Sequence, residues 1–383
     1  MEKIKVLISP NSYKGSASSV EAADYFEKYL CKSNNVEIIK RPVTDGGDGF
    51  LDVCKANFNL KIFVIKIPAP FKNKFLRCRI GYDEINQAVY IESADVLGLK
   101  VIPAKRQRAI ELNSFGLGIL LKELDQRNLQ KKLIIKKVFV GIGGTGTNDL
   151  GLGAASAFGL RIINKNRKSM HAIPLNFESI NDIYIPMIKL SFKIFTITDV
   201  ANPLTGRRGA TMMFGKQKGS TDEEIKLIEK GFLNIVKILK QKNYISKYEK
   251  LNGSGGGLAA GLKIFFDSHQ ISASDFILNY LGLKKYEGKV NYVVSGEGFF
   301  DEQSLMKKAP GIIIDLFRNS GKKIFLCCGI IDKNSLAAAG DKIIPIEFIS
   351  FWKTKNESLS LIEESIKIAS REILKYITKI IKD

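Results

Sequence analysis

The sequence is poor in the residues that build metal centres and disulfide frameworks. It contains only two histidines, and its five cysteines are scattered, odd in number and free of any Cys-x-x-Cys pair. A structural zinc site needs a closely spaced set of cysteine and histidine ligands, and the sequence has no such set. We therefore interpret the cysteines as small buried apolar residues of a protein kept in a reducing compartment.

Long apolar runs are also missing. The first apolar run ends at Ser9-Pro10, which makes it too short for the apolar region of a secretory signal. No segment reaches the roughly 20 apolar residues that a membrane-spanning helix requires. These absences predict a soluble, cytoplasmic protein without a membrane partner.

Acidic residues are scarce relative to basic ones. The chain has 59 lysines and arginines against 39 aspartates and glutamates, a formal net charge of +20. A basic field attracts nucleic acids and small anions alike. Most lysines alternate with isoleucine and leucine at amphipathic spacing, as in residues 368–382, which is typical of solvated helix faces. Because no nucleic-acid-binding motif is recognised, we predict no nucleic-acid partner and keep a basic nucleic-acid-binding protein only as an alternative.

Short apolar runs alternate with amphipathic stretches along all 383 residues. This alternation predicts an α/β fold with mainly parallel sheets. The length exceeds what one hydrophobic core usually supports, so we expect two domains. With crossing points near residues 60 and 285, one domain would be discontinuous, formed by 1–60 plus 285–383, and the other would span 61–284.

The expected elements follow from periodicity. Ser18 and Glu21 have the spacing of a capping box and predict the start of the first helix. Strands are expected at residues 5–9, 36–40, 60–67, 88–92, 133–140, 192–198, 292–295, 324–328 and 343–348. Further helices are expected at 47–57, 113–125, 148–158, 222–240 and 310–319. The last helix carries one apolar stripe, typical of core packing, made of Ile362, Ile366, Ala369, Ile373, Ile377 and Ile380.

Several predicted strands end directly in loops that combine glycine with an acid. These loops are residues 44–49, 141–149, 199–203 and 295–298, with Asp301 just beyond the last. Ligands of open α/β sheets bind at the carboxyl ends of strands, and glycine lets backbone amides approach an anion closely. Carboxylates beside a phosphate need an intervening cation. The set of loops therefore indicates phosphate together with Mg²⁺, although each loop alone is compatible with a tight turn.

One of these loops matches a dinucleotide-binding fingerprint, Gly141-x-Gly143-x-x-Gly146. That fingerprint also requires an acid about 20 residues later to hold the ribose. The corresponding residues 160–166 contain none, so an NAD-dependent oxidoreductase is retained only as an alternative. A Walker A loop is absent as well, because no Gly-Lys-Ser/Thr follows the glycines.

The loop after the first predicted strand, residues 10–18, carries Lys14 ahead of a helix start. This cation could meet a phosphate or a substrate carboxylate. Alternatively, Lys14 is solvated and Ser16 or Ser18 only caps the helix.

Taken in order, these segments closely resemble the bacterial glycerate kinase family from residue 1 to near the C-terminus. The resemblance rests on residues 9–16, 44–49, 141–149, 199–204, 214–219 and 295–298, with support from 113–116 and 252–255. It implies two interlocked Rossmann-like domains with mainly parallel sheets and an active site in the cleft between them. It further implies ATP-dependent phosphorylation of D-glycerate, with 2-phosphoglycerate the favoured product.

The resemblance also suggests roles for individual residues. Asp45, Asp48, Lys14 and Asp199 are the candidate catalytic residues. The candidate metal ligands for Mg²⁺ are Asp149, Asp199, Glu297 and Asp301. The candidate ATP-binding residues are Gly143, Gly144, Thr145, Gly146, Thr147, Asn148, Gly253 and Gly255.

The sequence departs from the family pattern at a few positions. Phe299 stands where the family usually has arginine, which removes a planar bidentate donor for carboxylate or phosphate. Further departures are Asn11, Leu97, Lys216 and the Lys307-Lys308 pair. The expected partner is a small-molecule substrate, glycerate, and a homodimer is the candidate assembly.

Overall fold

The structure, a computed structural model, describes residues 3–198, 202–306 and 308–382, and these fall into two units. Unit 1 consists of Met1–Asp45, Asp52–Asn59 and Ser272–Asp383, and unit 2 consists of Gly46–Leu51 and Leu60–Ile271. Each unit is built around one main sheet, so the α/β class with mainly parallel strands is confirmed.

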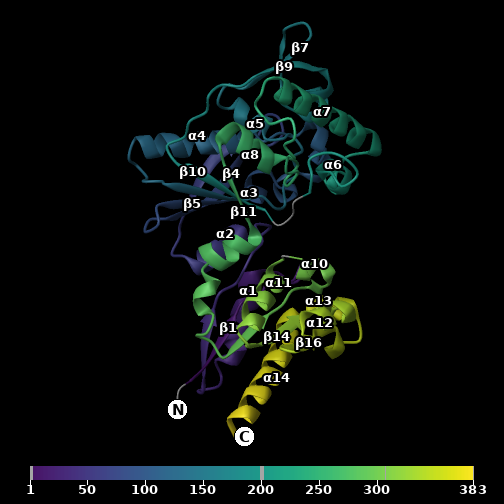
Figure 1. Ribbon diagram of the computed structural model, residues 1–383. Coiled ribbons are helices and arrows are strands. Elements are labelled where there is room, and N and C mark those ends of the chain that lie inside the picture. The colour runs from purple at the N-terminus through teal and green to yellow at the C-terminus, as the bar shows by residue number, and fades with distance from the viewer. Residues whose placement is uncertain (1–2, 199–201, 307, 383) are drawn as a thin grey trace. The chain divides into compact units, whose positions relative to one another are not determined.

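The main sheet of unit 1 has five strands in the order β16-β14-β12-β1-β2; Figure 1 labels β1, β14 and β16. Their bounds are β1 (Ile4–Ile8), β2 (Val36–Lys40), β12 (Tyr292–Ser295), β14 (Lys323–Cys328) and β16 (Ile343–Glu347). Every neighbouring pair is parallel. Numbered within the unit, the order is 2-1-3-4-5, a doubly wound sheet whose direction of winding reverses between β1 and β12. Ligands of such sheets bind at this switch point, outside the carboxyl ends of the strands.

Helices α1 (Ser19–Leu30) and α14 (Ile362–Lys382) pack against each other in unit 1. The predicted capping box is confirmed, because Ser18 Oγ accepts from Glu21 N–H at 3.2 Å and Glu21 Oε2 accepts from Ser18 N–H at 2.8 Å. The predicted stripe on α14 is buried through Ile377, whereas Ile380 is 44% exposed in the last turn of the chain. The remaining helices of this unit are α9 (Ala273–Asp275), α10 (Glu302–Leu305), α11 (Ala309–Asn319), α12 (Lys333–Ala339) and α13 (Lys355–Ser360).

The main sheet of unit 2 has the order β11-β10-β6-β5-β4-β3. Its strands are β3 (Lys61–Pro68), β4 (Phe75–Asp83), β5 (Ala88–Glu92), β6 (Lys137–Gly141), β10 (Lys193–Thr198) and β11 (His269–Ser272). Strands β5, β6 and β10 are parallel, while β3 and β4 add an antiparallel hairpin. The carboxyl ends of the three parallel strands therefore meet at one edge of the sheet.

The helices of unit 2 are α3 (Ser93–Leu97), α4 (Phe115–Leu129), α5 (Leu152–Ser156), α6 (Ala210–Phe214), α7 (Asp222–Gln241) and α8 (Leu258–Phe266). Helix α2 (Phe50–Asn57) contributes its first turn to unit 2 and its remainder to unit 1. The remaining strands form two smaller sheets. One consists of β7 (Arg161–Asn164), β8 (Ser169–Met170) and β9 (Ile180–Tyr184), and the other consists of β13 (Phe299–Phe300) and β15 (Ile330–Ile331). Short helices are η1 (Leu99–Val101), η2 (Ala104–Arg106), η3 (Ala109–Glu111), η4 (Pro174–Ser179), η5 (Phe276–Tyr280), η6 (Leu283–Tyr286) and η7 (Phe348–Phe351).

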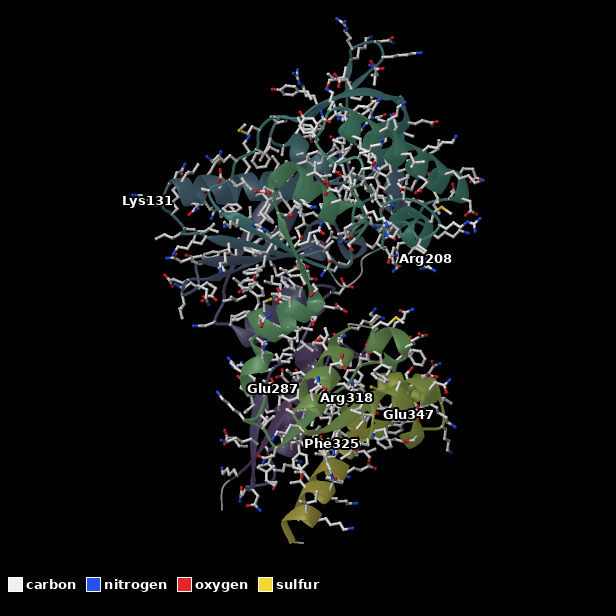
Figure 2. All side chains as sticks on the ribbon, in the orientation of Figure 1. Lys131, Arg208, Glu287, Arg318, Phe325 and Glu347 are labelled. Carbon is white, nitrogen blue, oxygen red and sulfur yellow. The ribbon has the colours of Figure 1, made fainter. Side chains whose placement is uncertain are left out.

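The side chains separate into apolar cores and a basic surface. Figure 2 shows Lys131 and Arg208 reaching into solvent, whereas Phe325 of β14 lies in the unit 1 core with 1% of its surface exposed. All five cysteines are free thiols; four are buried as expected and Cys31 is exposed. Among the described residues, no helix is both long and apolar enough to cross a membrane.

Candidate active site

A glycine-rich loop of residues 142–149, here called the glycine loop, follows β6 at the centre of the unit 2 sheet. Backbone hydrogen bonds hold it on both sides. Gly143 N–H donates to Gly46 O at 2.9 Å, and Gly146 N–H donates to Leu97 O at 2.7 Å. The loop is therefore fixed at the carboxyl edge of the parallel strands, where the sequence predicts a phosphate site.

Glycine is required in this loop because other backbone segments approach it closely. A Cβ on Gly143 would lie 2.3 Å from Gly47 Cα, and one on Gly144 would lie 2.5 Å from Asp48 Oδ1. The Gly144 backbone also has a φ of +71°, a conformation that favours glycine. The candidate catalytic residue Asp48 thus lies beside the candidate phosphate-binding residues, within the same unit.

A second glycine-rich segment, residues 253–257, packs on the glycine loop. A Cβ on Gly255 would lie 3.3 Å from Thr145 Oγ1, and one on Gly256 would lie 2.1 Å from Thr147 O. Gly253 instead faces Pro203, with its N–H donating to Asn202 O at 2.7 Å. The structure therefore brings Gly255 to the candidate phosphate-binding residues and places Gly253 against the 202–203 segment.

Two side chains of the glycine loop carry buried polar atoms that lack a partner. Thr147 and Asn148 are fully buried. In the part of the chain that the structure describes, neither Thr147 Oγ1 nor Asn148 Nδ2 makes a hydrogen bond. Buried polar groups in native proteins are nearly always satisfied. These two donors therefore fit a ligand that supplies acceptor oxygens, and phosphate is such a ligand.

The candidate metal ligand Asp149 has a different environment. Its carboxylate is 1% exposed and accepts from Ser114 N–H at 2.7 Å, Ser114 Oγ–H at 2.7 Å, Gly153 N–H at 3.1 Å and Gly151 N–H at 3.3 Å. Burial raises the pKa of this carboxyl, while these four donors lower it. The contacts of Asp149 join the starts of α4 and α5 to the glycine loop, and its role as a metal ligand stays a prediction.

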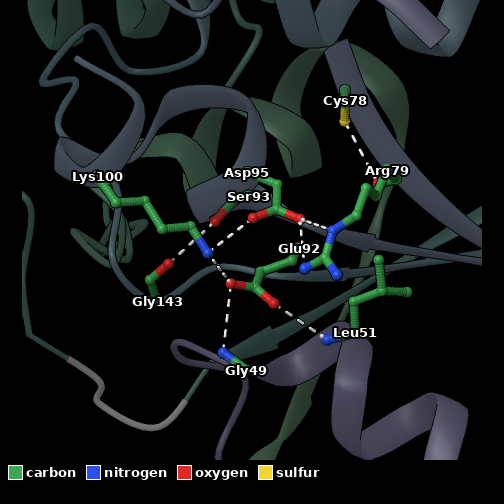
Figure 3. Close-up of polar contacts among 9 residues, drawn as sticks. All are labelled: Gly49, Leu51, Cys78, Arg79, Glu92, Ser93, Asp95, Lys100 and Gly143. Carbon is green, nitrogen blue, oxygen red and sulfur yellow. Dashed lines mark hydrogen bonds and ion pairs between the residues drawn. The ribbon is translucent and has the colours of Figure 1, made fainter. Parts of the chain in front are cut away.

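Glu92, which the sequence did not single out, organises the neighbouring segment (Figure 3). This fully buried carboxylate ends β5 and accepts from Gly49 N–H at 3.3 Å and Leu51 N–H at 3.1 Å. Lys100 donates to Glu92 Oε1 at 2.6 Å and also pairs with Asp95 at 2.7 Å. The Glu92 carboxylate thereby fixes the first turn of α2 beside the glycine loop. An acid at the end of an otherwise apolar strand is the sequence signal that could have found it.

Lys218 is a second residue that the site reasoning missed. Its side chain is 7% exposed, and Nζ donates to Thr147 O at 2.8 Å and Asn148 Oδ1 at 2.9 Å. Burial lowers the pKa of Lys218 to about 7, opposed by the charge of Asp149. The sequence signal was its place in the 214–219 segment that resembles the family.

In unit 1, Glu297 lies two residues after the end of β12, beside the winding switch point. Its carboxyl pKa is raised to about 7, mainly by burial and also by the charges of Asp45 and Asp301, while Ser304 and Lys308 act in the opposite direction. In the described structure, Glu297 Oε1 is buried and has no hydrogen-bond partner. Asp45 and Asp301 thus lie close enough to act electrostatically on the Glu297 carboxyl.

The loop after β1 lies against the loop after β12. Asn11 N–H donates to Gly296 O at 2.9 Å, and a Cβ on Gly298 would lie 3.4 Å from Lys14 N. Lys14 itself is exposed. Lys14 and Glu297 are therefore carried by the two loops that flank the switch point, which is where ligands of doubly wound sheets bind.

Asp301 has a contact of its own. It begins α10, and its Oδ1 accepts from Ser304 N–H at 3.0 Å. Phe299, the departure from the family arginine, is 52% exposed in β13. The candidate residue Asp199 lies outside the described residues.

No preformed metal centre stands out. Within residues 3–198, 202–306 and 308–382, no group of three or more histidine, cysteine, aspartate or glutamate side chains is arranged to hold a metal ion. Mg²⁺ in nucleotide enzymes commonly takes only one or two protein carboxylates and completes its shell with phosphate oxygens and water. The unit 1 acids are compatible with that kind of site.

The dinucleotide alternative meets a structural obstacle. After the glycine loop and α5, the chain enters β7, which belongs to a separate antiparallel sheet with β8 and β9. The fingerprint requires a parallel neighbour in the same sheet to carry the ribose-binding acid. The loop is therefore not part of the βαβ unit that binds NAD.

Comparison with known proteins identifies the family of this chain. The sequence model of the glycerate kinase family matches residues 6–378. The chain belongs to the glycerate kinase family. The resemblance found in the sequence is thereby confirmed, and the enzyme class is that of a phosphotransferase acting on glycerate.

Individual relatives cover most of the chain. It is 28% identical to a glycerate kinase of Neisseria meningitidis serogroup B over 371 residues, 96% of this chain and 95% of the relative. It is 27% identical to glycerate 2-kinase of Escherichia coli K12, with 80% of each chain covered. A crystal structure assigned to glycerate kinase 2 of Salmonella typhimurium LT2 shares the fold, with a TM-score of 0.79, 23% identity and 98% of both chains covered.

Proposed function

We propose that this glycerate kinase family member transfers the γ-phosphoryl group of ATP to the 2-hydroxyl of D-glycerate, giving 2-phosphoglycerate. The family assignment supports the kinase reaction, and the name of the Escherichia coli relative, glycerate 2-kinase, supports the 2-hydroxyl as acceptor. The observation that carries the proposal is the pair of unsatisfied buried donors, Thr147 Oγ1 and Asn148 Nδ2, in a loop lined with glycine.

The glycine loop is the proposed site of the ATP phosphates. Backbone amides of residues 143–148 and the hydroxyls of Thr145 and Thr147 would donate to phosphate oxygens. Phosphoryl transfer depends mainly on positioning and on neutralising charge, so a rigid cradle of donors is the chief requirement. Gly255 lets the second glycine segment pack closely enough to support this cradle.

The groups at the unit 1 switch point are the proposed glycerate site. Lys14 would pair with the substrate carboxylate, and Asp45 would accept the hydroxyl proton. General-base help of this kind is typically worth about 10²–10⁴-fold in rate. Asp48 and Asp199 are the other candidates for that proton, and Asp48 Oδ1 lies beside Gly144 of the glycine loop.

Glu297 and Asp301 are the proposed protein ligands of Mg²⁺, with Asp199 as a third candidate. When bound, the metal supplies positive charge that neutralises the phosphate oxygens. Asp149 is assigned to holding the glycine loop rather than to the metal.

The Rossmann-like character of both units, a cytoplasmic location and a homodimer remain predictions. The doubly wound order of the unit 1 sheet supports the Rossmann-like character.

The test is a coupled assay with ATP and Mg²⁺ that offers D-glycerate, L-glycerate and tartronate in turn. Enolase without a phosphoglycerate mutase as the coupling enzyme detects 2-phosphoglycerate alone, so it identifies the acceptor hydroxyl. We expect turnover of D-glycerate in that assay. Asp45→Asn and Asp199→Asn, measured separately at saturating ATP, test the base. Unchanged rates in both variants would refute this assignment of the proton acceptor.

A further inference from the structure

Lys218 is buried, and burial of its charged amine costs free energy. It lies between α6 and α7, and its side chain is 7% exposed. Taking an ammonium group out of water is strongly unfavourable unless hydrogen bonds compensate it. The compensation comes from Thr147 O at 2.8 Å and Asn148 Oδ1 at 2.9 Å. Both acceptors belong to the glycine loop.

This contact determines how the Asn148 carboxamide is oriented. A lysine amine has enough hydrogens to donate to both oxygens whether or not it carries a charge. The carboxamide oxygen therefore faces Lys218, and the NH₂ group faces away from it. The orientation of an asparagine is fixed by its hydrogen-bond partners, and here Lys218 is the partner that fixes it.

Gly256 covers the same two oxygens from another direction. A Cβ on Gly256 would lie 2.1 Å from Thr147 O and 2.3 Å from Asn148 Oδ1. The acceptors of this turn are thus occupied by Lys218 and covered by Gly256. The hydrogen-bearing atoms, Thr147 Oγ1 and Asn148 Nδ2, are the ones left unsatisfied in the described structure. In this buried turn the acceptors are therefore paired and the donors are not, a polarity that suits an anion.

We propose that Lys218 is a positioning residue for nucleotide phosphate binding, acting by holding the Thr147–Asn148 turn so that its donors face a phosphate oxygen. The inference rests on the proposed function, since it takes the glycine loop as the ATP site. Lys218 acts through the Thr147–Asn148 turn and does not itself touch the substrate. Its contribution is to nucleotide affinity rather than to glycerate affinity.

The test compares Lys218→Met, Asn148→Ala and the double variant with the wild-type enzyme. Lys216→Met is the matched control, because Lys216 is two positions away and pairs only at the surface, with Asp222 at 3.0 Å and both side chains more than half exposed. Binding of the ATP analogue adenylyl imidodiphosphate is measured by calorimetry without glycerate. Separate KM values for ATP and glycerate come from the coupled assay.

We expect Lys218→Met to weaken analogue binding and raise the KM for ATP by about 10–100-fold, the effect of losing hydrogen bonds to a charged donor. The KM for glycerate should change less than about twofold, and Lys216→Met should match the wild type. Because Lys218 acts through the turn to which Asn148 belongs, the loss of analogue binding in the double variant should be smaller than the sum of the two single losses. Additive losses would overturn the proposal, as would equal changes in both KM values.

Separate controls distinguish a loss of folding, a failure of the proposed function and a failure of the Lys218 inference. A melting curve is measured for each variant. If Lys218→Met does not fold, Lys218→Gln, which keeps an uncharged NH₂ donor group, replaces it in the same cycle and must show the same coupling. Wild-type enzyme that binds the analogue but leaves D-glycerate unchanged contradicts the proposed function alone. Wild-type enzyme that turns over D-glycerate while Lys218→Met keeps its nucleotide affinity contradicts the Lys218 inference alone.

Discussion

The Glu92 carboxylate accepts the backbone N–H of Leu51 at 3.1 Å across 41 positions of the sequence. Leu51 lies in the first turn of α2, where backbone donors lack partners within the helix. A buried acid at the end of one strand thus caps a helix that belongs to another segment. This contact, with that to Gly49, ties residues 46–51 to unit 2.

Glu92→Gln tests this tie. The substitution keeps the shape but replaces a charged acceptor, so the buried N–H groups of Gly49 and Leu51 lose part of their stabilisation. We expect a loss of about 1–3 kcal/mol in the free energy of unfolding, measured by urea denaturation. Glu84→Gln is the control, because Glu84 pairs with Lys61 at the surface with both side chains more than half exposed; it should cost under about 1 kcal/mol. Equal losses in the two variants would contradict a special role for Glu92.

Gly256→Ala separates steric contact from backbone strain. Gly256 has a φ of +69°, and its Cβ would lie 2.1 Å from Thr147 O. Gly288 has a similar φ of +76° but open space around the added Cβ. The left-handed backbone alone costs about 1–2 kcal/mol with alanine, so Gly288→Ala should show that loss and normal kinetics. Gly256→Ala should lose more stability and raise the KM for ATP at least about tenfold. Identical behaviour in the two variants would show that the contact with Thr147 is unimportant.

Much of the fold could be predicted because strand cores and helix caps are local signals. The strands at 36–40, 88–92 and 292–295 have the predicted bounds. The apolar run at 133–140 misled the prediction, since the strand begins at Lys137. Asn128 explains the difference: its side chain pairs with the N–H and C=O of Ile135, at 2.8 and 2.9 Å, so Ile135 enters the core from a loop.

Helix starts beside the glycine loops were also predicted too early. The helix expected at 47–57 begins at Phe50 after Gly49 with φ of +81°, and the one expected at 148–158 begins at Leu152 after Gly151 with φ of +67°. Left-handed residues stop a helix from extending backwards. The helical spacing of apolar residues alone does not reveal these left-handed residues, because that spacing continues through the turn.

The site was predictable where its residues lie in one loop and not where the fold assembles them. Gly143, Gly144, Gly146 and the neighbouring Thr147 and Asn148 were visible as a motif. Glu92 and Lys218 reach that motif from distant segments, and their roles depend on burial and on which oxygens they face. The spacing of residues along the chain reveals neither the burial of a side chain nor the oxygens that it contacts.

Asp149→Asn distinguishes a structural residue from a metal ligand. The carboxylate accepts four hydrogen bonds that join the starts of α4 and α5. An asparagine presents an NH₂ group toward some of those donors, so we expect about 2–4 kcal/mol lower stability. The loss should be the same with and without Mg²⁺ in urea denaturation of the nucleotide-free protein. If Asp149→Asn has normal stability but needs far more Mg²⁺ for activity, Asp149 is a metal ligand and the structural assignment is wrong.

Glu297 makes stability depend on pH. Its folded pKa is raised to about 7, mainly by burial, from the ordinary value of 4.5. Between those values the folded state binds more protons than the unfolded state, so this group lowers stability as pH rises from 4.5 to 7. Glu297→Gln removes the penalty. In the metal-free protein we expect it to be more stable than wild type by about 1–3 kcal/mol at pH 8, with the gain shrinking toward pH 5.

The measurement is urea denaturation of both proteins at pH 5, 6.5 and 8 in the presence of a chelator. Asp315→Asn is the control, because Asp315 pairs with Arg318 at the surface with its side chain 64% exposed. Its effect should stay within about 1 kcal/mol at every pH. Added Mg²⁺ should stabilise the wild type more at pH 8 than at pH 6, since a proton and a cation compete for the same carboxylate. A pH-independent difference between Glu297→Gln and wild type would show that this carboxyl is ionised throughout, and the cation site would then have to be sought elsewhere.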